Sequence, residues 1–315
     1  MTQVKKQWTI PEITAIYEQS FNDLLNQAHQ AHREHHEANS LQFATLLSIK
    51  TGACPEDCGY CAQSGHHKTR VEKEKLMSVA DVLQKAQEAK EGGAKRFCMG
   101  AAWRCPPEKV MPQLQEMIAG VKALGLETCM TLGMLNKEQA ADLKEAGLDY
   151  YNHNIDTSPS YYEKVVTTRK FSDRLQTLEN VREAGINVCC GGILGLGESR
   201  EDRIEFLLTL ANLETPPESV PINRLIPVAG TPLAKSPQVE GIELVRTIAT
   251  ARLLMPKSVI RLTAGRTEMS DELQALCYFV GANSVFIGDK LLTEDNPQRH
   301  KDKILFNKLG LTEMV

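Results

Sequence analysis

Apolar and polar positions along the chain repeat as a unit in which an amphipathic helical pattern ends at a glycine and a short β-rich run follows. The clearest helix-ending glycines are Gly93, Gly125, Gly147 and Gly185. Glycine just past a helix takes the left-handed backbone conformation at little cost, so each of these positions predicts a helix end. Ser78 and Ser199, each followed three residues later by an aspartate, predict helix starts.

The alternation of helical and extended patterns predicts a parallel sheet. Eight strands are expected, near residues 42–49, 95–101, 126–132, 150–156, 187–194, 219–227, 258–264 and 284–288. Eight such units favour an α/β fold of the (β/α)8 TIM-barrel type, which typically takes about 250 residues. A doubly wound open sheet is the competing topology. We expect one domain over residues 1–315, with a helical N-terminal extension at 1–40 and a short C-terminal extension at 290–315.

The bulk composition narrows the class of protein only modestly. A net charge of −4 over 315 residues argues against nucleic acid as a partner. No apolar run reaches bilayer-spanning length and the chain starts without an apolar signal core, so we expect a cytoplasmic protein with no membrane partner. Nine cysteines in a reducing compartment favour metal binding or catalysis over disulfides. The histidine-rich segment 29–37 is expected to be a solvated helix face rather than a metal site.

Three closely spaced cysteines follow the first predicted strand, at the face of a parallel barrel where active sites are built. Cys54, Cys58 and Cys61 can reach one metal centre but leave it one ligand short, whereas a structural zinc site needs four ligands. A four-iron cluster held by three cysteines would keep one iron open. The alternatives are three unrelated thiols, or a zinc site completed by His66 or His67.

The Cys-x₃-Cys-x₂-Cys spacing, with the aromatic Tyr60 before the last cysteine, resembles the radical S-adenosylmethionine (SAM) superfamily. The resemblance implies a 4Fe–4S cluster whose open iron binds the amino and carboxylate groups of SAM. It also implies reductive cleavage of SAM to a 5′-deoxyadenosyl radical that abstracts hydrogen from unactivated carbon.

A second set of cysteines lies in three different predicted strands, each four or five residues after a helix-ending glycine. Cys98, Cys129 and Cys189 should therefore lie at similar depth and can all point inward. Buried cysteine is common as a small apolar residue, so the pattern leaves a second metal centre and simple packing both open. The remaining cysteines are assigned to packing or the surface: Cys105, Cys190 and Cys277.

Polar residues alternate along the strand predicted at 150–156, where Asn152, Asn154 and Asp156 would share one face. Buried polar groups need partners, so a polar ligand is expected, and Asn223 can join them. A hydrogen-bonded structural network is the alternative. The glycine-rich run 191–197 allows close backbone approach to a ligand but is a weak indication of a dinucleotide site.

Several stretches narrow the resemblance to the biotin synthase family, over roughly residues 10–310. They are FCMGAAW at 97–103, YYNHNIDT at 150–157, GGILGLGE at 191–198, VPIN at 220–223 and RLTAGR at 261–266. The resemblance implies sulfur insertion into dethiobiotin to form biotin. It also implies a 2Fe–2S cluster that donates the sulfur, with the ligands Cys98, Cys129, Cys189 and Arg261. From its chemistry alone, Arg261 would be a buried hydrogen-bond donor.

The same resemblance assigns ligand contacts residue by residue. The cofactor-binding set it implies is Tyr60, Gly100, Asn152, Asp156, Arg174, Ile193 and Ile226, with Asp156 on the ribose, Arg174 on the SAM carboxylate and the isoleucines flanking the adenine. The substrate-binding set is Asn154 and Asn223 on the ureido ring, with Thr293 in the carboxylate site. Glu294 stands where the family has threonine, which puts a side-chain contact there in doubt, and Cys190 stands where it has serine.

The resemblance also implies an external electron donor such as flavodoxin, and a homodimer. Two rival functions are another radical enzyme of the same architecture and a non-catalytic iron–sulfur sensor or carrier. The internal cysteine set argues against the first, and an amide-lined pocket argues against the second.

Overall fold

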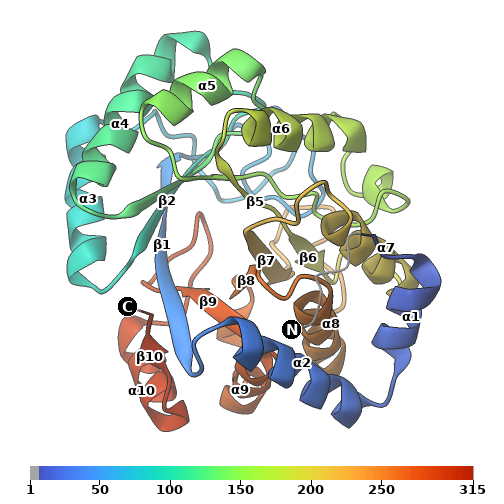
Figure 1. Cartoon of the computed structure of the whole chain (residues 1–315). Coiled ribbons are helices and arrows are strands. Elements are labelled where there is room, and N and C mark those ends of the chain that lie inside the picture. The colour runs from blue at the N-terminus through green and yellow to red at the C-terminus, as the bar shows by residue number, and fades with distance from the viewer. Residues whose placement is uncertain (1–6, 315) are drawn as a thin grey trace.

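The computed structural model describes residues 7–314 and contains a closed barrel of parallel strands with helices outside it (Figure 1). The strands are β1 (Ser40–Lys50), β2 (Arg96–Ala101), β3 (Glu127–Thr131), β4 (Tyr150–Asn152), β5 (Asn187–Cys189), β6 (Gly192–Leu194), β7 (Ser219–Arg224), β8 (Val259–Leu262) and β9 (Ala282–Phe286). Neighbours pair in chain order, with β5 and β6 both on β7, and β9 pairs with β1 to close the ring. The predicted TIM-type barrel is confirmed, and the open sheet is excluded.

Two predicted strands depart most from the structure, and the strand predicted at 219–227 also ends early, at Arg224. The run at 187–194 is broken into β5 and β6 at Gly191, whose backbone packs so tightly that an added Cβ would lie 1.9 Å from the carbonyl oxygen of Pro221. The run at 150–156 stops at Asn152, and Asp156 has φ 68°, in the left-handed region rather than the β region. Both breaks occur at the carboxyl ends of the strands.

The outer helices follow the predicted alternation. They are α3 (Val79–Glu91), α4 (Met111–Ala123), α5 (Lys137–Glu145), α6 (Phe171–Glu183), α7 (Arg200–Ala211), α8 (Gly241–Leu254) and α9 (Asp271–Phe279). The Oγ atoms of Ser78 and Ser199 accept hydrogen bonds from the backbone three residues on, as predicted for helix caps. The four helix-ending glycines all have positive φ, between 74° and 97°. No helix within 7–314 is long and apolar enough to cross a bilayer.

Terminal segments pack against the outside of the barrel. Helix α1 (Ile10–Glu18) contacts α7 and α8, and α2 (Phe21–His35) lies along α8. After the barrel, α10 (Arg299–Leu309) leads to β10 (Thr312–Glu313), which pairs with the start of β1. The expectation of a fully solvated histidine face was wrong in part: His32 is 6% exposed, and His36 contacts Arg252 of α8.

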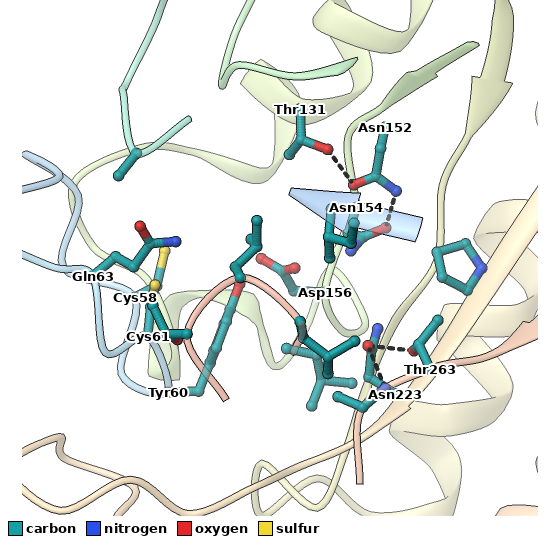
Figure 2. Close-up of a pocket in the computed structure, with 18 of the residues that line it drawn as sticks. Cys58, Tyr60, Cys61, Gln63, Thr131, Asn152, Asn154, Asp156, Asn223 and Thr263 are labelled. Carbon is teal, nitrogen blue, oxygen red and sulfur yellow. Dashed lines mark hydrogen bonds between the residues drawn. The ribbon is translucent and has the colours of Figure 1, made fainter. Parts of the chain in front are cut away.

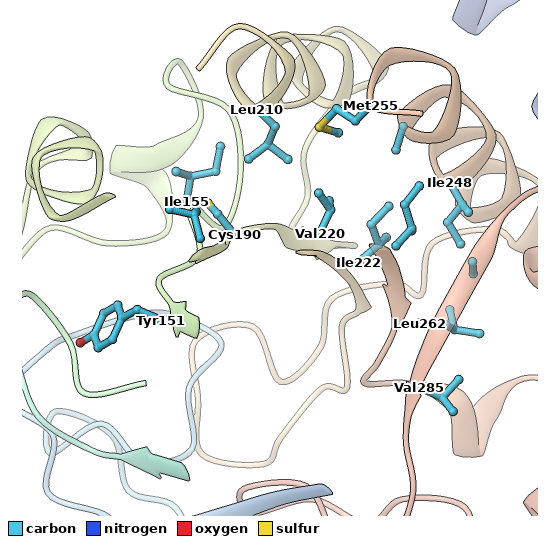
Figure 3. Packing of buried hydrophobic residues seen from close by; sticks show 14 of the residues in the cluster. Tyr151, Ile155, Cys190, Leu210, Val220, Ile222, Ile248, Met255, Leu262 and Val285 are labelled. Carbon is cyan, nitrogen blue, oxygen red and sulfur yellow. The ribbon is translucent and has the colours of Figure 1, made fainter. Parts of the chain in front are cut away.

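The main apolar core lies between the outer face of the strands and the helices. Outward-pointing Val220, Ile222 and Leu262 pack against helix residues such as Leu210 and Ile248 (Figure 3). The opposite face of these strands points into the barrel, because side chains alternate along a strand. That inner face carries the polar and sulfur-containing groups.

Candidate active site

A cavity of about 340 Å³ opens inside the barrel (Figure 2). Its lining includes most of the predicted site residues: Cys54, Cys58, Tyr60, Cys61, Cys98, Cys129, Asn152, Asn154, Asp156, Arg174, Cys189, Ile193, Asn223, Ile226, Arg261 and Thr293. Gly100 is not part of this lining. An added Cβ at Gly100 would come within 2.6 Å of a methyl of Leu292, which itself lines the cavity.

The cysteine loop turns sharply as it leaves β1. Gly52 and Ala53 have φ of 71° and 50°, and this pair of left-handed residues reverses the chain. The backbone amide of Cys54 then donates a hydrogen bond to the carbonyl oxygen of Gln63 at 2.9 Å, and the carbonyl oxygen of Cys54 accepts one from the amide of Gly65 at 2.7 Å. These bonds fold the loop back on itself and bring its three thiols to one side of the cavity.

Buried charges anchor the loop from outside. Glu56 is 2% exposed and accepts a hydrogen bond from Arg104 Nη1 at 3.1 Å and another from Thr168 Oγ1. Arg169 Nη2 lies 3.6 Å from Cys58 Sγ. Sequence reasoning missed these anchors, because Arg104 lies 48 residues from Glu56 and Thr168 and Arg169 lie more than a hundred residues from the loop.

The two histidines of the loop brace its backbone. His66 Nε2 lies 3.0 Å from the carbonyl oxygen of Pro55, and His67 Nε2 lies 3.0 Å from that of Cys58. Within residues 7–314, no three histidine, cysteine or acidic side chains are close enough to hold a single metal ion. Both imidazoles lie on backbone carbonyl oxygens, which disfavours a zinc site completed by either histidine.

The chemistry of the three thiols fits a positively charged metal centre. Burial raises the pKa of Cys58 to about 11 and that of Cys61 to about 12. Neither thiolate is stable there alone, and bound iron would supply the missing positive charge. Three ligands leave the fourth position of such a cluster for another molecule.

The second cysteine set meets inside the barrel. Cys98 and Cys129 are register partners on β2 and β3, and the thiol of Cys129 lies within hydrogen-bonding reach of both Cys98 and Cys189. All three are 1–3% exposed. Cys190 turns the other way, into the apolar core behind the strand, as expected from alternation.

Arg261 lies against these thiols. Its Nη1 is 4.0 Å from Cys98 Sγ, and its Nε donates to Ser284 Oγ at 2.8 Å. The hydrogen bond from Cys129, opposed by burial and assisted by the charge of Arg261, lowers the pKa of the Cys189 thiol. Three thiols and a guanidinium in one buried ring fit a small iron–sulfur cluster.

An amide face lies across the cavity from Cys58 and Cys61 of the cysteine loop (Figure 2). Asn152 Nδ2 donates to Asn154 Oδ1 at 3.3 Å and lies 3.2 Å from Cys189 Sγ. Asn223 Nδ2 donates to the carbonyl oxygen of Gly192 at 2.9 Å, and its Oδ1 accepts from Thr263 Oγ1. The amides are therefore held in place by protein partners and lie beside the inner cysteines.

Arg174 and Asp156 pair with each other in the cavity wall. Arg174 Nη2 donates to Asp156 Oδ2, and Arg174 Nε donates to Tyr162 OH at 2.9 Å. Both side chains are 5% exposed or less. A ligand that contacted either residue would meet a charge already compensated by the other.

The remaining predicted contacts lie at the rim of the cavity. Ile193 and Ile226 are half-buried on β6 and after β7, and Thr293 Oγ1 donates to Glu294 Oε1 at 3.3 Å. Thr131 and Thr263 also line the cavity and were not predicted. Thr131 ends β3, and Thr263 directly follows β8. Their position at the end of a strand was the only indication in the sequence that they line the site.

The barrel, the cysteine loop at the end of its first strand and the buried pocket define a radical SAM enzyme. The model of the Radical SAM superfamily matches residues 48–210, and that of the Biotin and Thiamin Synthesis associated domain matches residues 221–312. Among solved structures, methylornithine synthase has TM-score 0.81 at 17% identity, covering 98% of this chain and 95% of that one. The FeFe-hydrogenase maturase HydG from Carboxydothermus hydrogenoformans has TM-score 0.80 at 17% identity, covering 96% and 75%. These structures establish the shared fold.

Relatives at high identity narrow the class. The biotin synthase of Legionella pneumophila (strain Lens) is 85% identical over 315 residues, all of both chains. That of Thioalkalivibrio sulfidiphilus is 60% identical over 99% of this chain and 92% of its own, and that of Coxiella burnetii (strain Dugway 5J108-111) is 59% identical over 97% and 95%. The chain belongs to the biotin synthase family.

Proposed function

We propose that this enzyme inserts sulfur into dethiobiotin to form biotin, with SAM as the radical source. The observation that carries the proposal is one pocket lined by two separate cysteine sets and by an amide face. A ureido ring offers both donors and acceptors, and asparagine side chains match both.

The chain's own residues hold, orient and shield the reactants. Cys54, Cys58 and Cys61 would hold a 4Fe–4S cluster, which supplies the electron for reductive cleavage of SAM when it is bound. The hydrogen bonds to Asn154 and Asn223 keep their amides fixed before substrate arrives, which lowers the ordering cost of binding. Burial of the pocket excludes water from a radical reaction.

The finer part of the proposal assigns the inner site a 2Fe–2S cluster. Cys98, Cys129 and Cys189 would hold it, with Arg261 as the fourth group, and a sulfide of this cluster would be the inserted sulfur. Asn152, Asp156, Arg174 and the rim isoleucines would contact SAM. We further propose a homodimer in the cytoplasm that receives electrons from a flavodoxin-type donor.

Anaerobic reconstitution tests both cluster sites. About six irons per chain (four plus two) and biotin formation from dethiobiotin, SAM and reductant are expected. Cys58→Ala should abolish 5′-deoxyadenosine formation, whereas Cys189→Ala should retain part of it and lose biotin. A persistent four irons per chain would refute the second cluster, and normal biotin formation by Cys189→Ala would refute the sulfur-donor role.

The same experiment separates the rivals. An iron–sulfur sensor would hold iron without cleaving SAM. A radical enzyme with another product would form 5′-deoxyadenosine without biotin. Sedimentation of the reconstituted protein measures the proposed dimer, and reduction by purified flavodoxin tests the electron donor.

A further inference from the structure

Below the inner cysteines, four polar side chains form a chain of hydrogen bonds across the barrel. Three of them are buried, and the side chain of Glu127 is 42% exposed. Arg261 Nη2 donates to Gln42 Oε1 at 3.0 Å, and Gln42 Nε2 donates to Glu127 Oε2 at 3.2 Å. Arg96 Nε donates to the same carboxylate oxygen at 2.9 Å. We refer to Arg96, Glu127, Gln42 and Arg261 as the polar chain. It joins strands β2, β3, β1 and β8, so no local motif marks it.

The strand register places the polar chain next to the inner cysteines. Arg96 and Glu127 are register partners, as are Cys98 and Cys129 two residues further along the same strands. Side chains alternate with period two, so the two pairs share the inward face and lie one layer apart. The polar chain is therefore the layer on which the cysteine set rests.

Gln42 is the uncharged member that links the two arginines. It is 8% exposed, accepts from Arg261 through one amide atom and donates to Glu127 through the other. With Ser284 holding Nε, Arg261 is fixed at two points, which leaves Nη1 beside Cys98. No ion pair found within residues 7–314 includes Arg261, so its charge remains available to whatever the cysteines bind.

Arg96 places a second guanidinium in the same layer, where it is ion-paired with Glu127 at 2.9 Å. It is 0% exposed, and its Cζ lies 3.5 Å from the centroid of the Tyr150 ring. Within the described residues, its Nη1 and Nη2 have no hydrogen-bond acceptor. A buried donor without a partner is destabilising. Sulfur atoms of a bound cluster are acceptors that would fill this gap.

We propose that Gln42 is a positioning residue that locks Arg261 beside the inner cysteines and couples it to the Glu127–Arg96 pair. The two guanidinium groups then bracket a bound iron–sulfur cluster. Three thiolates exceed the charge of an oxidised two-iron core, so such a cluster is a buried anion and becomes more negative on reduction. Nearby positive charge stabilises the reduced form and raises the reduction potential. This role rests on the proposed 2Fe–2S site.

The test compares reconstituted wild-type protein with Gln42→Met and Gln42→Glu. Methionine keeps the volume but makes neither hydrogen bond, so Arg261 loses one of its two anchors and is held by Ser284 alone. We expect a lower reduction potential for the two-iron signal and at least fivefold faster loss of two irons to a chelator. Glutamate keeps the acceptor for Arg261 but adds a negative charge beside Glu127. It should retain iron better than methionine while lowering the potential further, a combination that loss of packing alone would not produce.

Gln274→Met is the matched control. Gln274 is 5% exposed and accepts from Arg266 Nε at 3.1 Å, and its hydrogen-bond partners Arg266, Met269 and Tyr278 lie outside the inner cysteine set. Gln274→Met should lower thermal stability without changing the reduction potential of the two-iron signal. A folded Gln42→Met protein that holds only about four irons would have lost the two-iron cluster although all its cysteine ligands are present. That result would also support the role of Gln42.

Two results overturn the proposal in distinguishable ways. Wild-type potential and iron release in Gln42→Met, with about six irons in both proteins, would refute the role of Gln42 and leave the second cluster standing. About four irons in the wild-type protein would refute the second cluster and with it this role.

Discussion

The buried ion pair between Arg174 and Asp156 offers a quantitative test of how the pocket wall is held. The two side chains are 5% and 2% exposed, and Arg174 also donates to Tyr162 OH at 2.9 Å. Arg174→Met removes the charge and keeps much of the volume. It leaves the Asp156 carboxylate buried without its counter-charge.

The expected cost follows from that isolated charge. Breaking a buried pair by removing one partner costs about 3–5 kcal/mol, whereas replacing both partners with neutral groups costs far less. Asparagine suits position 156 because φ there is 68°, a conformation that asparagine tolerates. The double variant Arg174→Met/Asp156→Asn should therefore regain at least about 2 kcal/mol of the loss in Arg174→Met.

Urea unfolding of the cluster-free protein, followed by circular dichroism, measures this difference. With an m-value of about 3 kcal/mol/M, Arg174→Met should lower the midpoint by about 1 M or more. Lys308→Met is the control, because Lys308 pairs with Asp271 at 3.2 Å on the surface with side chains 62% and 55% exposed. That pair should contribute less than about 1 kcal/mol.

SAM binding to the reconstituted variants separates structure from recognition. If both residues contact SAM, the double variant should regain stability but not affinity. A double variant as unstable as Arg174→Met would refute the reasoning about the buried charge.

Two further predictions concern backbone space and pH. Gly191→Ala should lower the free energy of unfolding by more than about 3 kcal/mol, because a Cβ there would lie 1.9 Å from the backbone oxygen of Pro221. Gly125→Ala is the control, because its Cβ would meet nothing within 4 Å. It should cost about 1 kcal/mol, since alanine is strained at a φ of 81°. Equal urea midpoints for the two alanine variants would contradict this. Burial, followed by the charge of Arg252, lowers the pKa of His32 from 6.5 to about 3. Between these two pH values His32 is protonated in the unfolded chain and neutral in the folded protein, so the free energy of unfolding should fall as pH drops from 6.5 toward 3. His32→Gln should make this fall less steep. An unchanged slope of the urea midpoint between pH 7 and 5 would count against it.

Features that depend on residues close in sequence were predictable. The caps at Ser78 and Ser199 and the glycine at each helix end require only neighbours within one turn. Eight alternating units then favoured a closed barrel, which the structure contains. The cysteine loop belongs to the same class, because three thiols within eight residues are brought near one another by chain length alone.

Features that depend on how strands are staggered were not predictable from the residues. The break at Gly191 exists because Pro221 of the neighbouring strand occupies the space beside it. Arg174 and Asp156 were each expected to face a ligand, and only the tertiary structure pairs them with each other. Neither contact leaves a pattern within its own segment.

The sequence by itself determined the element order and the position of the radical-generating loop, since short-range backbone chemistry dictates both, and it favoured a barrel over an open sheet. The tertiary structure decided that Cys98, Cys129 and Cys189 meet, and that Gln42 links the arginines beside them. The reason is closure of the barrel, which sets the stagger of strands far apart in sequence and thereby which inward side chains share a layer.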